Sequence, residues 1–154
     1  MNIRTFLVTL LVLAGASAAL ADPGSPLGRW QTIDDKTGKA RAIVRIYEAG
    51  GGTLQGDIEQ VFYEPHETPN ATCPRCPAPQ KGKPVLGMTI LWGLKKPEYG
   101  SGRQFGEGRI LDPNNATVYQ CKITLAPDGK TLAVRGYVGM TGTLGRTQRW
   151  HRLS

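Results

Sequence analysis

Apolar and polar residues alternate with a period of two along most of the chain beyond residue 27, and this alternation constrains the fold more than any other feature. Leu54, Gly56 and Ile58 share one face of an extended segment, whereas the acidic Asp57 and Glu59 share the other. Successive side chains of a β-strand point to opposite faces, so this period predicts strands with one buried and one hydrated face. We therefore expect a chain built mainly from antiparallel strands.

Eight segments of this kind are separated by turn sequences such as DPNN at residues 112–115 and PDGK at residues 127–130. The predicted strands span residues 30–33, 42–47, 54–62, 86–94, 105–111, 118–125, 132–138 and 146–153. No helical periodicity occurs between them. Eight short antiparallel strands predict an all-β domain, either a closed β-barrel or a β-sandwich. The barrel is favoured, because closure removes the unpaired sheet edges that invite aggregation.

The first 21 residues have the composition of a secretory signal peptide. Arg4 gives a positive start, residues 6–14 form an apolar run, and Ala19-Leu20-Ala21 matches a small-x-small cleavage site. The apolar run is too short to be read as a membrane-spanning helix. We therefore expect residues 1–21 to be removed and residues 22–154 to form a single barrel domain, either periplasmic or secreted.

The chain is basic, with a formal net charge of +7 that becomes +6 when Arg4 leaves with the signal peptide. Its lysines and arginines are scattered, and the longest run is Lys95-Lys96. Such a balance suits anionic partners such as lipid head groups or acidic ligands, and it equally suits a well-solvated surface. Export argues against nucleic acid as a partner. The oligomeric state is left open.

Four blocks of sequence occur in order across about Leu27–Arg152. They are GRWQTIDDKTGKARAIVRIYE, then GKPVLGMTILWGLKK after a pair of cysteines, then GRILDPNNATVYQCKITL, and finally VRGYVGMTGTLGRTQRWHR. Together they resemble a bacterial exported family known as domain of unknown function 2147. The resemblance implies an exported, barrel-like domain, and it brings no established activity, cofactor or catalytic residue.

The triplet Gly28-Arg29-Trp30 is similar to the Gly-x-Trp of lipocalins. In that superfamily the tryptophan plugs the closed end of an eight-stranded barrel against an arginine near the end of the last strand. The resemblance implies that Gly28 and Trp30 are barrel-closing residues, with Arg146 or Arg152 as the arginine because both share parity with Trp150. A long polar stretch after the third strand and the short chain depart from the lipocalin pattern.

The motif CPRCP at residues 73–77 can be a redox pair, half of a metal site or a structural disulfide. A catalytic Cys-x-x-Cys usually has its first sulfur at a helix N-terminus, and here the motif lies in a proline-rich segment between strands. A zinc site needs four ligands, and Cys121, His66 and His151 offer no second closely spaced pair for Cys73 and Cys76. No metal site is predicted.

A disulfide is therefore the favoured reading of the motif, because exported thiols tend to oxidise. Cys73 can pair with Cys76 and leave Cys121 reduced on an apolar strand face. Alternatively, either of the first two bonds Cys121 and ties the long segment to the barrel. The local Cys73–Cys76 pair is slightly favoured.

No set of catalytic residues is recognisable, since the few serines have no neighbouring histidine. Candidates for lining a ligand cavity are the apolar residues Met88, Ile90, Trp92 and Tyr119. The leading hypothesis is a periplasmic barrel that binds a small apolar or lipid-like ligand without a cofactor. One alternative is a filled barrel that acts as an envelope or protein interaction module. Another, less favoured, is a thiol- or metal-dependent activity at Cys73 and Cys76.

Overall fold

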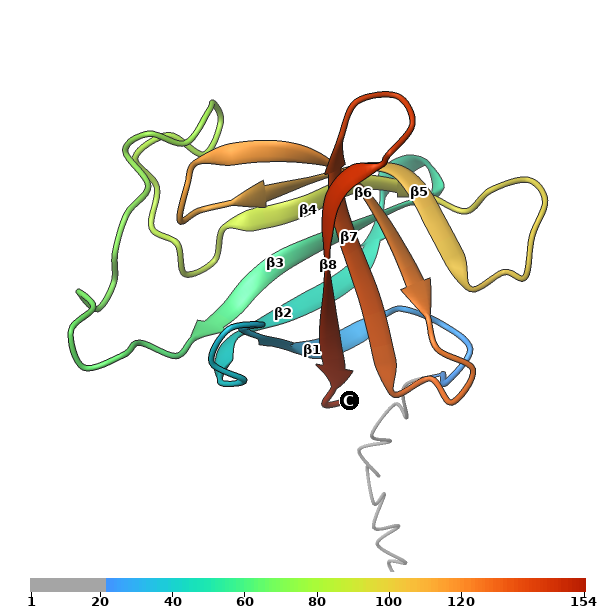
Figure 1. Ribbon diagram of the computed structural model, residues 1–154, viewed down its shortest axis with the longest axis horizontal. Helices are drawn as coiled ribbons and strands as arrows, with labels where there is room; N and C mark the ends of the chain where they lie inside the picture. The colour runs from blue at the N-terminus through green and yellow to red at the C-terminus, as the bar shows by residue number, and fades with distance from the viewer. Residues whose placement is uncertain (1–21) are drawn as a thin grey trace, which may run out of the picture.

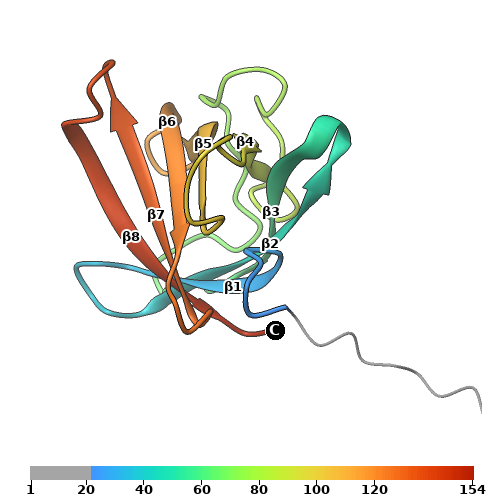
Figure 2. The same cartoon turned by 90° about the vertical axis from the view of Figure 1, so that its right-hand side faces the viewer.

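The computed structural model describes residues 22–154, and the predicted signal peptide lies outside the described residues. The strands are β1 (Gly28–Ile33), β2 (Ala40–Ala49), β3 (Thr53–Val61), β4 (Thr89–Lys95), β5 (Gln104–Asp112), β6 (Thr117–Leu125), β7 (Thr131–Val138) and β8 (Leu144–Arg152). Each pairs antiparallel with the next in sequence, and β1 pairs with β8 to close the barrel. Figures 1 and 2 show this closed arrangement from two sides. The predicted all-β barrel is confirmed, in place of the sandwich.

Within residues 22–154, no helix is long and apolar enough to cross a membrane.

The alternation of β3 is reproduced in its burial. Leu54, Gly56 and Ile58 are buried, and Glu59 on the opposite face is exposed. At Gly56 a side chain would crowd Leu91 of β4, since an added Cβ would lie 3.1 Å from the Leu91 Cβ. The glycine therefore allows β3 and β4 to pack closely inside the barrel.

Strand β4 departs from the expected alternation. A single apolar face over residues 86–94 was predicted, whereas the structure fully buries Leu91 and Leu94 and leaves Leu86 47% exposed. Gly93 has a φ of 69°, a left-handed conformation that an extended strand does not use. This glycine changes the alternation within the strand, which explains why Leu91 and Leu94 are buried together.

Because the strands alternate in direction, their connections gather at two ends of the barrel. One end carries the 3-10 turn Gly50–Gly52 and residues 96–103 and 126–130, together with the C-terminus. The other end carries residues 34–39, 62–88, 113–116 and 139–143. In Figure 1 the long loop 62–88 lies at the left and the β4–β5 loop at the right. We call the end with the long loop 62–88 the open end, and the end with the C-terminus the closed end.

Trp30 plugs the closed end. Its side chain is fully buried, and its Nε1 donates a hydrogen bond to the Pro26 carbonyl at 2.8 Å. The guanidinium carbon of Arg152 lies 4.3 Å from the centroid of the Trp30 ring. A guanidinium over an indole face is a favourable cation–π arrangement, and here the guanidinium covers the Trp30 ring at the closed end.

Arg152 also ties three chain segments together. Its guanidinium donates to the carbonyls of Gly129 at 2.6 Å, Leu27 at 2.9 Å and Ser25. The closing strand pair needs a glycine at the start of β1, because Gly28 has a φ of 124° and an added Cβ would lie 2.3 Å from the Ser154 carbonyl oxygen. The β1–β8 seam is therefore fixed by a glycine, a tryptophan and an arginine.

Replacing Arg152 with lysine should lower the free energy of unfolding by about 2 kcal/mol. Lysine keeps the positive charge but cannot reach three carbonyls with a planar fork, so buried acceptors lose their donors. Urea denaturation followed by tryptophan fluorescence measures the change. Arg149→Lys is the matched control on the exposed face of β8 and should change stability by less than about 0.5 kcal/mol. Equal effects of the two substitutions would contradict a special role for Arg152.

Candidate ligand-binding cavity

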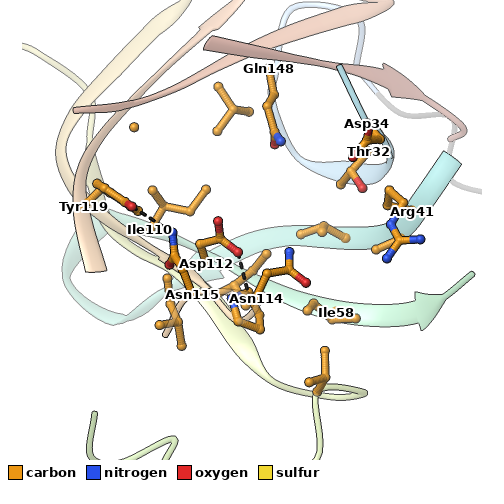
Figure 3. A pocket seen from close by; sticks show the side chains of 18 of the residues that line it. Thr32, Asp34, Arg41, Ile58, Ile110, Asp112, Asn114, Asn115, Tyr119 and Gln148 are labelled. Atoms are coloured by element: carbon orange, nitrogen blue, oxygen red, sulfur yellow. Dashed lines mark hydrogen bonds between the residues drawn. The ribbon is translucent and has the colours of Figure 1, made fainter. Parts of the chain in front are cut away.

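The open end of the barrel leads into a cavity of about 790 Å³. Its wall includes side chains from β1, β2, β3, β4, β5, β6, β7 and β8, and its rim includes residues of the long loop 62–88. Figure 3 shows the cavity with lining side chains from several strands directed toward its centre. A volume of this size lies within the range of pockets that enclose small-molecule ligands.

The deep wall of the cavity is apolar. Val44 of β2, Ile58 of β3, Val134 of β7 and Trp150 of β8 all line it and are all buried. They occupy inward positions of strands whose opposite positions face water, so the period-two pattern places them there. Ligand surface that enters this part of the cavity leaves water for an apolar environment, which is favourable in proportion to the area buried.

A few polar groups are placed among these apolar side chains. Gln148 reaches into the cavity from β8, and its Oε1 accepts a hydrogen bond from Trp150 Nε1 at 3.3 Å (Figure 3). On the β5–β6 side, Asn115 Nδ2 donates to the Tyr119 hydroxyl at 2.9 Å. The hydroxyl of Tyr63, which also lines the cavity, is buried and has no hydrogen-bond partner among the described residues. Such a group is unfavourable when unpaired, and a polar atom of a ligand would satisfy it.

The rim of the cavity carries charge. Arg41 of β2 donates to Glu67 of the long loop in an ion pair, and Arg146 Nε of β8 lies 2.6 Å from Asp35 Oδ2. The hydrogen bond from Arg41 holds the pKa of Glu67 below its ordinary value, with a further contribution from the backbone N–H of Glu64. Backbone N–H groups of Thr37 and Lys36 likewise lower the pKa of Asp34. The mouth is therefore a ring of mixed charge around an apolar interior.

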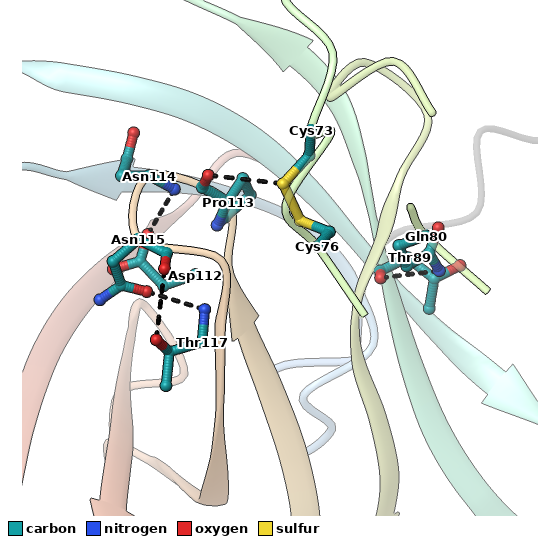
Figure 4. Close-up of a disulfide and its surroundings, with 9 residues drawn as sticks. All are labelled: Cys73, Cys76, Gln80, Thr89, Asp112, Pro113, Asn114, Asn115 and Thr117. Atoms are coloured by element: carbon teal, nitrogen blue, oxygen red, sulfur yellow. Dashed lines mark hydrogen bonds between the residues drawn. A yellow bond between two sulfur atoms is a disulfide. The ribbon is translucent and has the colours of Figure 1, made fainter. Parts of the chain in front are cut away.

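The long loop is folded onto the barrel and bears a disulfide between Cys73 and Cys76. Both cysteines are buried, and Cys73 Sγ lies 3.7 Å from the Pro113 carbonyl oxygen in the β5–β6 turn (Figure 4). A second attachment is the hydrogen bond from Gln80 Nε2 to the Thr89 carbonyl at 3.3 Å. The loop therefore contacts the barrel at the β5–β6 turn and at the start of β4, and its residues Ala71, Thr72 and Val85 complete the cavity wall.

Cys121 is the unpaired cysteine. It lies on β6, is fully buried, and burial raises the pKa of its thiol to about 12. A thiol with so high a pKa carries almost no thiolate at neutral pH, so it is unsuited to nucleophilic or redox chemistry. Among residues 22–154, no group of three or more histidine, cysteine, aspartate or glutamate side chains is arranged to hold a metal ion.

The four expected cavity residues divide into two pairs. Ile90 and Tyr119 line the cavity, whereas Met88 and Trp92 do not. Met88 precedes β4 and is buried in the core, and Trp92 lies half-buried in β4 opposite Arg109 of β5. The changed alternation of β4, which buries the neighbouring Leu91, accounts for the position of Trp92.

The two expected arginines also separate. Arg152 is the one that lies over Trp30, while Arg146 sits at the open end, where it lines the cavity and pairs with Asp35. Parity could not distinguish them, because they are six residues apart on one strand face. Only the pairing of Trp30 directly with Arg152 across the β1–β8 seam does so.

Several residues of the cavity were missed by reasoning from the sequence. Tyr63 and Glu67 lie in the long loop, which has no periodicity from which a direction could be inferred. The partner of Arg41 is Glu67, 26 residues away in sequence, and no local pattern links the two. Asp34 follows β1 and Asp112 ends β5, and both border the mouth.

A closed barrel of eight antiparallel strands with a ligand-sized cavity at one end is a lipocalin-like barrel. A similar solved structure is protein HP1028 from Helicobacter pylori, which is described as belonging to the lipocalin family. The two chains are 19% identical, with a TM-score of 0.67 over 83% of this chain and 82% of the other. At that identity the likeness concerns the fold.

Residues 28–152 match the family described as an uncharacterised protein conserved in bacteria, domain of unknown function 2147. The chain belongs to this family, as its sequence blocks led us to expect. No curated protein matches the chain significantly.

Replacing Glu67 with glutamine should lower stability at neutral pH and have little effect in acid. The folded-state pKa of Glu67 is lowered from 4.5, so its contribution is full above about that pH and is lost as pH falls through the lowered value. The difference in free energy of unfolding should reach up to about 1 kcal/mol at pH 7, since the pair is partly exposed. Denaturant titrations across this pH range measure it, with the exposed Glu48→Gln as control. A difference that is independent of pH would contradict the ion pair.

Thiol counting should give a distinct result in each state of the protein. The native chain should react with iodoacetamide at no cysteine, because two are bonded and Cys121 is buried with a raised pKa. Denaturation should expose one thiol, which peptide mapping assigns to Cys121, and reduction should expose three. Reduction should also lower stability by about 2 kcal/mol in the chain-entropy model, as expected for so short a loop. A bond that maps to Cys121 would contradict the local pair.

Proposed function

We propose that this protein is an exported barrel that binds a small apolar or lipid-like ligand in the cavity at its open end. The observation that carries the proposal is the cavity itself, about 790 Å³ with buried apolar side chains deep inside and polar groups at the mouth. A lipid-like molecule matches this distribution, with its apolar part against Val44, Ile58 and Val134. Its polar end then lies near the rim.

The unsatisfied hydroxyl of Tyr63 supports a ligand that carries at least one polar atom. The ion pairs at the rim already neutralise Arg41 and Arg146, so the interior itself presents no free charge from these residues. Binding is therefore expected to depend mainly on apolar burial, with hydrogen bonds fixing orientation. No step of bond making or breaking is part of the proposal.

Two alternatives have less support. A barrel filled by its own side chains would leave no space of this size, so the cavity favours binding over a purely structural interior. A thiol-dependent activity needs an accessible thiolate, and the disulfide and the buried Cys121 offer none in the described state. Export is proposed from the signal-peptide pattern of residues 1–21, and a disulfide is compatible with an oxidising compartment.

Native mass spectrometry of protein recovered from the periplasm of its own cells tests both whether a ligand is bound and whether the protein is exported. The expected result is a chain beginning near Asp22 with extra mass that leaves on denaturation. A chain that retains residues 1–21 in the cytoplasm would contradict export. The released molecule is then identified by its fragmentation.

A cavity-blocking substitution tests where the ligand sits. An added Cβ at Gly136 would lie 3.4 Å from Ile110 and 3.5 Å from Tyr119, so Gly136→Leu fits at its base and extends into the cavity. The affinity for a dansyl-labelled undecanoic acid should fall by roughly tenfold, while the fold is retained. Gly106→Leu on β5 is the matched control, since an added Cβ there has nothing within 4 Å. Absence of probe binding, or equal effects of the two substitutions, would contradict the proposed site.

A further inference from the structure

Strands β6, β7 and β8 carry positive charge and no acid. Their sequences are TVYQCKITL, TLAVRGYV and LGRTQRWHR. The cations are Lys122, Arg135, Arg146, Arg149 and Arg152. Three consecutive strands without a single carboxylate form a positive wall in a chain that has 12 acids elsewhere.

Three of these cations lie on the outside of the barrel. Lys122 and Arg135 sit directly opposite each other in the β6–β7 register, and Arg149 lies opposite Ala133 on the neighbouring strand. None of the three takes part in an ion pair among residues 22–154. The Arg135 guanidinium is turned toward β8, where it donates to the Thr147 hydroxyl at 3.2 Å. Its charge and those of Lys122 and Arg149 are not neutralised by any carboxylate of the described residues, so this face suits an anionic partner.

The tip of the β7–β8 hairpin is apolar and exposed. Met140 is fully exposed, Leu144 is 71% exposed and Val138 is 47% exposed. Val138 and Leu144 are paired with each other in the ladder, so the three side chains belong to one hairpin end. Val138 and Leu144 lie on its inner side and line the cavity mouth, whereas Arg135 and Arg149 lie on its outer side. In Figure 1 this hairpin forms the top of the molecule, apart from the long loop 62–88. Exposed apolar side chains gathered in this way indicate an interaction site.

The cationic wall and the apolar tip are joined. Arg135 Nη2 donates to the Gly142 carbonyl at 2.8 Å and to the Thr143 carbonyl at 3.3 Å, so one of the wall's cations lies directly beneath the tip. The hairpin therefore carries an apolar tip with Arg135 next to it, and Lys122 and Arg149 farther from the tip on the outer face. An apolar end followed by cations matches the depth profile of an anionic bilayer. There the acyl chains lie below a layer of negatively charged head groups.

We propose that the β7–β8 hairpin and the outer face of β6–β8 dock on an anionic lipid bilayer. Met140 and Leu144 enter the boundary between head groups and acyl chains, while Lys122, Arg135 and Arg149 contact the head groups. The two contributions act together, because either a short apolar tip or a few cations alone gives only weak, reversible binding. The docking surface does not depend on whether the cavity holds a ligand.

A consequence rests on the proposed function. Val138 and Leu144 line the cavity mouth as well as the exposed tip, so the apolar tip adjoins the entrance to the barrel. Docking through this hairpin places the mouth at the acyl boundary. A lipid-like ligand can then pass between bilayer and cavity without crossing water.

Sedimentation with lipid vesicles tests the docking surface. A chain beginning at Asp22 is used, because residues 22–154 contain the whole closed barrel and an apolar signal peptide would itself insert into lipid. Vesicles of roughly one-third phosphatidylglycerol in phosphatidylcholine should bind the protein, and pure phosphatidylcholine should bind it at least roughly tenfold more weakly. Added salt should weaken the binding to the anionic vesicles.

Matched variants locate the surface. Lys122→Glu combined with Arg149→Glu should lower the partition coefficient by more than about 20-fold, at roughly fivefold for each cation lost. The control Lys95→Glu with Lys96→Glu makes the same change in net charge on and beyond β4 and should have a much smaller effect. Met140→Asp should lower binding by roughly tenfold or more, whereas Tyr99→Asp, at another highly exposed residue, in the β4–β5 loop, should not.

Four results would overturn the proposal. The first is that the protein does not bind anionic vesicles, and the second is that it binds neutral vesicles equally well. The third is that the control variants lose as much binding as the test variants. The fourth is that the hairpin binds a protein partner and does not bind lipid. Thermal unfolding checks that each variant is folded. Met140→Asp should leave the affinity for the dansyl-labelled probe in solution unchanged, since Met140 lies outside the cavity lining. A failure of docking is thus separable from a failure of ligand binding.

Discussion

The contact between Trp30 and Arg152 is the interaction on which the rest of the structure depends. Trp30 pairs with Arg152 across the only seam that joins the first strand to the last among residues 22–154, and the guanidinium lies over the indole ring. Since strand pairing can slip by residues and each slip of one reverses every side chain, this contact holds the seam in register. With the seam fixed, the strands present alternate residues inward except where β4 changes its alternation, and the interior is defined.

The two ends of the barrel then perform different tasks. At the closed end, short connections and the plug fill the interior with side chains. At the open end, a 27-residue connection, residues 62–88, is constrained locally by the Cys73–Cys76 disulfide and contacts the barrel at Pro113 and Thr89. This loop adds wall to the cavity without filling it. The rim is braced by the ion pairs Arg41–Glu67 and Arg146–Asp35.

The sequence predicts the barrel well because the signals for strands and turns lie within short stretches of the chain. A period of two and turn residues at short intervals identify all eight strands. They do not predict irregularities within the strands, such as the left-handed conformations of Gly93 in β4 and Glu107 in β5. The cavity is harder to predict. Tyr63, Glu67 and Arg41 meet through a loop that has no period, so their juxtaposition depends on tertiary contacts. Arg146 and Arg152 have equal parity. Only their positions along the barrel axis distinguish Arg146 at the rim from Arg152, which covers the Trp30 plug.

The separation of the plug from the mouth has a consequence for engineering. Substitutions in the four connections of the open end can change the shape and charge of the mouth while leaving the seam between β1 and β8 intact. The rim can therefore be redesigned under little constraint from folding.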